Sequence, residues 1–296
     1  MEKRIFKFGK TSFAIILPKK WVDKSSLDTS GTIFLSENDR GDLIISPRER
    51  SKKEFEIKIN SRFNPKLIGR WVGKLYTYGL SKIKISSDDH FTDTQLKEIE
   101  DEIKNECPGF EVTHQTNNEI FIEDFTDLNQ ISIDKIISRL RYLIKQQFEE
   151  AKKQNTKTVS KIEKLVDRFN MLGIRYLNIV EPKDALKYFR ILSFLEYISD
   201  YTLLIVDNFE VNVEIFNEIS KAFDLCFFDK LEKIQNTAEI REKIYKMVKK
   251  FKIKKLPAYL FKKIADYISQ IAEFELKKES SIRKMKGWTK IEKKNL

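Results

Sequence analysis

The C-terminal half of the chain carries two short acidic motifs, Glu163-Lys164-Leu165-Val166-Asp167 and Glu196-Tyr197-Ile198-Ser199-Asp200. The two acids of each motif are four residues apart, a spacing that places both side chains on the same face of an α-helix. A short turn around Pro182 separates the motifs, so the two helices are expected to be antiparallel neighbours. Asp167 and Glu196 are almost equally far from Pro182. The same holds for Glu163 and Asp200, so each pair is expected to be offset by only roughly 1.5 Å along the helix axes. We therefore expect the four carboxylates to converge between the two helices.

Four carboxylates at one level between two helices would repel one another unless a cation neutralised them. The sequence therefore predicts a metal site made by Glu163, Asp167, Glu196 and Asp200. A set of oxygen ligands favours magnesium, calcium, manganese or iron over metals that prefer thiolates. The alternative is that these acids lie on solvated helix faces and pair with basic neighbours, namely Lys164, Arg168 or Arg190.

The overall composition is that of an ordinary folded protein. The chain has 296 residues, enough for more than one domain, and 41% of them are apolar. Its apolar runs are far shorter than the ~20 residues that span a bilayer, and its start lacks the apolar segment of a secretory signal. We expect a soluble cytoplasmic protein without a membrane span. The isolated Cys107, Cys226, His90 and His114 predict neither a disulfide framework nor a zinc site.

Positive charge is concentrated at the C-terminal end. The formal net charge is +11, and residues 241–296 hold 18 Lys and Arg against 6 Asp and Glu. Such an end suits a polyanion, an anionic membrane surface or an acidic partner. Residues 281–296 are expected to form a basic tail, for which a purely solvated segment is the alternative.

Residues 1–50 are predicted to form a small β-rich domain. Short runs rich in Ile and Phe, separated by Gly and Pro, predict strands at 4–8, 12–17, 32–36 and 42–46. A segment of this size is too small to bury a core alone. A second copy that exchanges strands across a two-fold axis would solve that problem.

The run from Gly9 to Val22, which ends in Leu17-Pro18-Lys19-Lys20-Trp21-Val22, resembles the AbrB/MazE/SpoVT swapped-hairpin family. The resemblance implies an intertwined dimeric β-barrel and hence a homodimer. Many members of that family bind DNA through basic residues of the paired N-terminal strands and loops. By position, the residues expected to contact DNA phosphates are Arg4, Lys7, Lys10 and Lys19. The alternative is a domain that serves only for dimerisation.

Residues 54–127 are expected to form a small α/β sandwich. The predicted elements are strand 54–59, helix 65–78, strand 81–86, helix 93–106 and a hairpin of strands 110–115 and 119–123. This segment contains no glycine-rich phosphate loop and no recognisable catalytic set. Its predicted role is that of a spacer or docking module.

Residues 131–280 are expected to be helical throughout. Six helices are predicted, at 132–153, 158–179, 182–209, 213–233, 238–251 and 257–279. The spacing of their apolar residues is typical of amphipathic helices that pack as bundles.

The two acidic motifs, with Arg175 downstream of the first, resemble PhoU, the phosphate-uptake regulator family. The resemblance implies two related three-helix bundles that bind iron, zinc or magnesium-type ions. With the swapped-hairpin and α/β segments included, the whole chain resembles archaeal PhoU-type regulators. In the second bundle, Lys243 and Lys262 stand where acids would be required, so a second metal cluster is not expected.

These features favour a multidomain α+β regulator of phosphate homeostasis rather than an enzyme. It would bind DNA as a dimer through its N-terminal domain, while the helical domain senses metal and phosphate. The expected cofactor is a divalent or ferric ion, namely Mg, Mn, Fe or Zn, with phosphate as a second ligand. Two alternatives stay open: a dimeric adaptor that docks on a phosphate transporter or a signalling kinase without contacting DNA, and a metal-dependent phosphoesterase.

Overall fold

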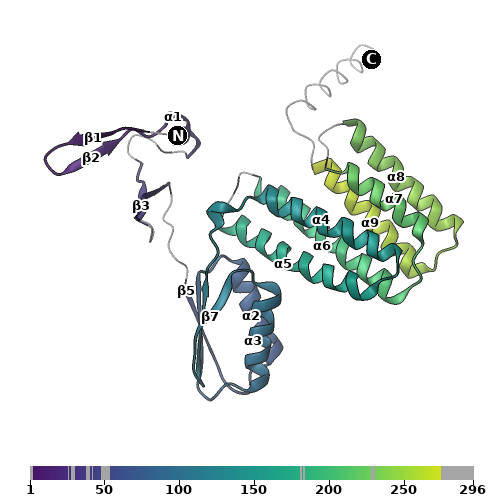
Figure 1. The fold of residues 1–296 in the computed structure, drawn as a ribbon, viewed down its shortest axis with the longest axis horizontal. Coiled ribbons are helices and arrows are strands. Elements are labelled where there is room, and N and C mark those ends of the chain that lie inside the picture. The colour runs from purple at the N-terminus through teal and green to yellow at the C-terminus, as the bar shows by residue number, and fades with distance from the viewer. Residues whose placement is uncertain are drawn as a thin grey trace, which may run out of the picture. The chain divides into compact units, whose positions relative to one another are not determined.

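The computed structural model has a mixed α+β architecture, which confirms the predicted fold class at this level (Figure 1). It describes residues 3–25, 27, 31–37, 41, 43–47, 54–180, 182, 184–227 and 231–274. The chain divides into two compact units, residues 1–52 and residues 53–296. The predicted basic tail at 281–296 lies outside the described residues.

The first unit contains two β-hairpins and a short helix. Strand β1 (Ile5–Phe8) pairs antiparallel with β2 (Ser12–Ile15), and β3 (Phe34–Glu37) pairs antiparallel with β4 (Leu43–Ser46). Gly9 adopts a positive φ of 70°, which suits glycine, and begins the turn between β1 and β2. Helix α1 (Lys19–Lys24) follows directly after Pro18. Each strand lies within two residues of its predicted position.

The two hairpins form separate two-stranded sheets, and the described residues of this single chain contain no closed barrel. Every residue of β1 and β2 is exposed. Phe8 and Phe13 are 72% and 68% exposed, so most of each residue is in contact with water. An isolated two-stranded hairpin is marginally stable at best. Apolar side chains that stay exposed to water add nothing to its stability.

The second unit begins with a four-stranded sheet in the order β5-β6-β8-β7. The strands are β5 (Glu54–Ile59), β6 (Lys82–Ser87), β7 (Phe110–Gln115) and β8 (Glu119–Asp124). β5 and β6 are parallel, whereas β8 is antiparallel to both β6 and β7. Helices α2 (Pro65–Thr77) and α3 (Asp93–Glu106) cover one face of the sheet (Figure 1). These elements match the predicted ones within two residues.

Apolar and polar residues alternate along the strands, and this alternation determines which face of the sheet is buried. Ile83, Ile85 and Ile122 are fully buried in a core shared with the two helices. Between them, Lys84 lies on the open face and forms ion pairs with acids of β5 and β8. The sheet therefore has one helix-covered face and one charged face.

A 3-10 turn at Leu128–Gln130 and six helices follow. The helices are α4 (Ile133–Lys152), α5 (Thr156–Val180), α6 (Ala185–Asn208), α7 (Val213–Leu225), α8 (Leu231–Lys250) and α9 (Lys255–Phe274). α5 packs against α4 and α6, α8 packs against α7 and α9, and α6 packs against α9 (Figure 1). The buried side chains of all six helices form one continuous apolar cluster.

The predicted boundary between the fourth and fifth helices of this region is wrong. A break was expected between 233 and 238, but α7 ends at Leu225 and α8 continues through that stretch. Thr237 is 1% exposed, and its hydroxyl donates to the carbonyl of Lys233 at 2.8 Å. Because a threonine can satisfy its hydroxyl inside a helix in this way, a polar residue there is no sign of a break.

Arg175 of α5 joins the helices to the α/β layer. Its side chain is 1% exposed and donates hydrogen bonds to the carbonyl oxygens of Tyr76 and Leu80 and to the carboxylate of Asp124. The guanidinium also lies over the Tyr76 ring, 4.7 Å from its centre. The resemblance placed Arg175 with the acidic motif, whereas the structure places it at the joint between α5 and the sheet.

Candidate metal centre

Three of the four predicted ligands come together between α5 and α6. Glu163 and Asp167 project from α5 and Asp200 from α6, all three half-buried, and one carboxylate oxygen of each lies within 4.8 Å of the others. These three acids are thus close enough for their charges to repel one another. Without a cation, this repulsion favours a proton on one of the carboxyl groups.

Glu196, the fourth predicted ligand, lies beside this group but outside its closest contacts. Its Oε2 atom accepts a hydrogen bond of 2.8 Å from Nδ2 of Asn170, a residue of α5. Burial is the main cause that raises the pKa of Glu196, and the charges of Asp200 and Glu163 add to it, so its carboxyl group is within electrostatic reach of the cluster. The structure thus gathers three acids tightly and keeps the fourth adjacent.

Burial raises the pKa of every acid in this group. The pKa of Asp167 rises to about 8, first because its carboxyl group is removed from water and then because of the charge on Glu163. Burial also raises the pKa of Glu196 to about 7, that of Asp200 to about 6 and that of Glu163 above its ordinary value. Desolvation and like charge both disfavour the ionised carboxylate, and a bound cation would oppose both effects.

Two buried oxygen atoms at the cluster have no hydrogen-bond partner within the described part of the chain. They are Oδ1 of Asp167 and Oδ1 of Asn170. Asn170 is 3% exposed, and its bond to Glu196 directs the amide toward the acids. Buried polar atoms without partners are rare in folded proteins. Carboxylate and amide oxygens are also the ligands that hard cations prefer, so these atoms fit an oxygen-ligated ion.

Basic neighbours do not neutralise the cluster. Lys164 lowers the pKa of Glu163, but this effect is smaller than that of burial. Across the residues that the structure describes, the ion pairs formed by lysine and arginine involve other acids. The described residues therefore do not form the alternative arrangement, in which solvated acids pair with Lys164, Arg168 or Arg190.

A fifth acid, in the α/β layer, acts electrostatically on this group. Glu106 is the half-buried last residue of α3, and α3 packs against α5. Its charge raises the pKa of both Asp167 and Glu196, and Glu163 in turn raises the pKa of Glu106. Glu106 was not among the residues predicted from the sequence. The four-residue spacing of acids along α3 was an available signal, but spacing alone does not reveal that the helix docks on α5.

On helices α8 and α9, where the resemblance would place a second set of acids, the described polar side chains pair with one another. Asp266 accepts a hydrogen bond of 2.7 Å from the hydroxyl of Tyr245, and Lys262 lies over the ring of the same tyrosine. Lys243 pairs with Glu218 at 3.0 Å. Among the described residues, the group on α5 and α6 is the one place where three potential metal ligands of this kind meet.

The predicted DNA-contacting residues all lie in the first unit. Lys7 is on β1, Lys10 is in the turn that follows it, and Lys19 is the first residue of α1. These three residues and Arg4 are exposed. Their side chains are therefore accessible to a partner.

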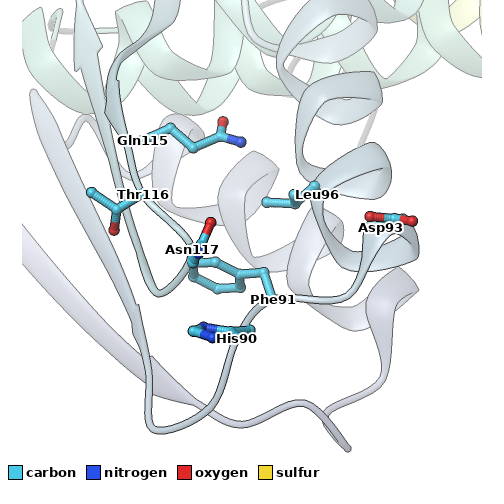
Figure 2. A pocket seen from close by; sticks show the side chains of 7 residues that line it. All are labelled: His90, Phe91, Asp93, Leu96, Gln115, Thr116 and Asn117. Atoms are coloured by element: carbon cyan, nitrogen blue, oxygen red, sulfur yellow. The ribbon is translucent and has the colours of Figure 1, made fainter.

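A shallow hollow of about 380 Å³ surrounds His90 in the α/β layer (Figure 2). The segment that leads into α3 and the turn between β7 and β8 form it, and its lining includes Phe91 and Asn117. The side chains of His90 and Asp93 do not converge on a common point (Figure 2). The seven lining residues thus offer no metal-binding or catalytic arrangement.

Comparison of the chain with protein-family models, curated proteins and solved structures gives no match. The class of protein is described by its fold and its site: it is an α+β chain in which two helices bring together a cluster of half-buried carboxylates. None of the described helices has both the length and the apolar character that a bilayer crossing requires.

Proposed function

We propose that this protein is a cytoplasmic, metal-binding regulator of phosphate homeostasis. Glu163, Asp167, Glu196 and Asp200 would hold a divalent or ferric ion, namely Mg, Mn, Fe or Zn. The observation that carries this proposal is the meeting of three half-buried carboxylates without a basic partner, next to an unpaired buried oxygen of Asn170. Bound there, the ion would supply the missing positive charge and open coordination positions that suit phosphate oxygens.

The charge balance at the cluster would make helix packing sensitive to ligands. Without a cation, the acids of α5 and α6 must take up protons or move apart, because burial and repulsion raise the pKa of each of them. An effector that binds one packing arrangement better than the other shifts the balance between them. The resemblance to PhoU supports phosphate as that effector.

The first unit would act as the dimeric output module. The exposed side chains of Phe8 and Phe13 would be covered by a second copy of the same chain, as the swapped-hairpin resemblance implies. Arg4, Lys7, Lys10 and Lys19 would then contact DNA phosphates. In the alternative, the same dimer docks on a phosphate transporter or a signalling protein and leaves DNA untouched.

Metal binding is tested by elemental analysis of the purified protein and by equilibrium dialysis against Mg²⁺, Mn²⁺ and Zn²⁺. A cation at about 100 times its Kd should stabilise the fold by about 2.7 kcal/mol and raise Tm by several degrees. Asp200→Asn should abolish this rise. Asp266→Asn, which changes the matching aspartate of α9, should retain it. A purified chain that contains no metal and binds none of these ions would overturn the site.

DNA binding is tested by fluorescence anisotropy with double-stranded DNA over a range of salt concentrations. The Lys7→Ala/Lys10→Ala variant should lower the slope of log affinity against log salt by about 2, because two phosphate contacts are lost. The matched change Lys157→Ala/Lys161→Ala, which removes two exposed lysines of α5, should leave it unchanged. Identical affinities for DNA with and without Mn²⁺ and phosphate would contradict the proposal that these ligands control DNA binding. Weak, salt-insensitive association would favour the adaptor.

A further inference from the structure

The turn between α8 and α9 carries a dense group of lysines. The two helices pack against each other (Figure 1), and residues 243–265 contain nine lysines and no acidic residue. Five of these lysines lie in the turn or at the helix ends beside it, and all five are exposed. This lysine cluster consists of Lys249, Lys250, Lys252, Lys254 and Lys255. Because its members follow one another so closely along the chain, their charges share one end of the helix pair.

The described acids do not neutralise the lysine cluster. Ion pairs between residues that the structure describes involve none of its five members. The flanking acids along the chain have other partners. Glu242 pairs with Arg241 at 3.1 Å, and Asp266 accepts a hydrogen bond of 2.7 Å from the hydroxyl of Tyr245. The lysine cluster is thus a concentrated positive surface.

Local folding accounts for only part of the lysine cluster. Lys249 and Lys250 end α8, where the helix dipole favours positive charge. Lys252 has a φ of 50°, in the left-handed region that glycine usually occupies after a helix. Lys254 and Lys255 stand at the start of α9, where the dipole disfavours positive charge and the first turn holds no acid. Three lysines therefore occupy positions that the local backbone disfavours, which indicates a role outside the fold.

Exposed apolar residues adjoin the lysine cluster on α9. Leu256 directly follows Lys255 and is 54% exposed, and Tyr259 is 49% exposed. The two are three residues apart on a helix, so they share a face. Lys263 lies over the ring of Tyr259, with its Nζ atom 5.6 Å from the ring centre. Basic, leucine and tyrosine side chains are therefore combined on one surface.

This combination fits a lipid bilayer better than a nucleic acid. Anionic headgroups attract lysines, while leucine and tyrosine side chains enter the apolar edge of the interface. A phosphate backbone would attract the lysines but offers no apolar layer for Leu256. Arginine, the residue best suited to paired contacts with phosphates and bases, is absent from residues 243–265.

We propose that the lysine cluster, together with Leu256 and Tyr259, is a docking surface for an anionic membrane. The contact is peripheral, because none of the described helices is suited to cross a bilayer. Electrostatic attraction supplies most of the binding, so the association is reversible and weakens as salt screens the charges. The proposal does not depend on the metal site of α5 and α6.

Sedimentation of the full chain with large unilamellar vesicles tests this surface. The wild type should bind vesicles with about 30% phosphatidylglycerol in phosphatidylcholine, but not vesicles of phosphatidylcholine alone. Lys249→Gln/Lys254→Gln should weaken this binding about 25-fold, which corresponds to about 5-fold for each lysine. The matched control is Lys157→Gln/Lys161→Gln, which removes two exposed lysines of α5. It should stay within about 2-fold of the wild type, because distant surface charges are screened.

Lys252→Gly separates binding from folding. Glycine suits the positive φ at this position, so the variant should be at least as stable to heat as the wild type. It should nevertheless bind the anionic vesicles about 5-fold more weakly, because one lysine is lost. Leu256→Gln should weaken vesicle binding at least about 3-fold at both low and high salt, since its contribution is apolar.

The proposal is overturned if the wild type does not bind the anionic vesicles, or if Lys249→Gln/Lys254→Gln binds them as tightly as the wild type. Equal losses in the Lys157→Gln/Lys161→Gln control would also overturn it. A third contrary result is weaker binding of double-stranded DNA by Lys249→Gln/Lys254→Gln with unchanged vesicle binding, because the surface would then serve a nucleic acid. These measurements contain no added metal, so their outcome is independent of the metal site.

Discussion

Asn170 of α5 donates a hydrogen bond of 2.8 Å to Oε2 of Glu196 on α6, at the level where the acids of the two helices meet. The same amide leaves its Oδ1 atom buried and without a partner in the described chain. The two ends of one side chain thus have different surroundings. Nδ2 positions an acid, and Oδ1 offers a neutral oxygen of the kind that hard cations accept.

Replacing Asn170 by alanine should impair both roles. The metal-free protein should lose about 1 kcal/mol of its free energy of unfolding, because a hydrogen bond to a carboxylate is removed. The affinity for Mn²⁺ should fall about 10-fold, because Glu196 loses its positioning contact. Urea denaturation and equilibrium dialysis measure the two effects. An unchanged Mn²⁺ affinity would contradict the assigned role of this amide.

The metal-free protein should lose stability as the pH rises from about 5 to 8. The pKa of Asp167 is raised to about 8 and that of Glu196 to about 7 in the folded state, whereas unfolded acids have pKa values near 4. Between these limits the folded state binds more protons, so raising the pH favours unfolding. The expected loss is on the order of 2 kcal/mol, after allowance for partial exposure of these groups.

Thermal unfolding in the presence of EDTA at a series of pH values measures this trend. An excess of Mg²⁺ should reverse its sign, because cation binding requires the ionised carboxylates. The double variant Asp167→Asn/Glu196→Gln should show a nearly flat profile under both conditions. A decline of the same size in this variant would assign the pH dependence to other groups.

The sequence predicts the acidic cluster well because its origin is local. Four-residue spacing within each motif and the short turn at Pro182 predict that Glu163, Asp167 and Asp200 lie close together, as they do in the structure. The strands of the sheet are predicted for a similar reason, since alternation of apolar and polar residues is visible within a single strand. Features that depend on residues close together in the sequence can therefore be predicted from it.

The contacts between the α/β layer and the helices could not be predicted in this way. Arg175 and Asp124 are 51 residues apart, and their ion pair exists only because α5 docks on the end of the sheet. The contribution of Glu106 depends on the same docking. No periodicity within one helix specifies which distant element covers it, so tertiary packing decides both cases.

Arg175→Met should destabilise the second unit by about 3–5 kcal/mol, the usual effect of breaking a buried ion pair. The side chains of Arg175 and Asp124 are 1% and 10% exposed, so the remaining carboxylate would stay largely buried without its partner. Adding Asp124→Asn should recover part of the loss, since it removes the uncompensated charge. Urea denaturation of the two single variants and the double variant gives the interaction energy. A loss below about 1 kcal/mol would show that this joint contributes little.

The exposed hairpin of the first unit predicts a dimer that charged substitutions disrupt. Phe8 and Phe13 lie on the paired strands β1 and β2, and both are largely exposed in a single chain. Replacing both by lysine should leave an isolated chain folded, because neither ring contributes to a buried core. The same change should prevent a second copy from covering the hairpin, since two lysines would be desolvated in the interface.

Light scattering after gel filtration should give twice the chain mass of 35.1 kDa for the wild type and a single chain mass for the Phe8→Lys/Phe13→Lys variant. Phe125→Lys is the matched control, because this aromatic side chain is 67% exposed but lies in the second unit. It should remain dimeric. Circular dichroism of both variants should retain the helical signal, because the helices have a core of their own. A wild-type monomer, or a hairpin variant that stays dimeric, would exclude the hairpin as the surface that pairs two chains.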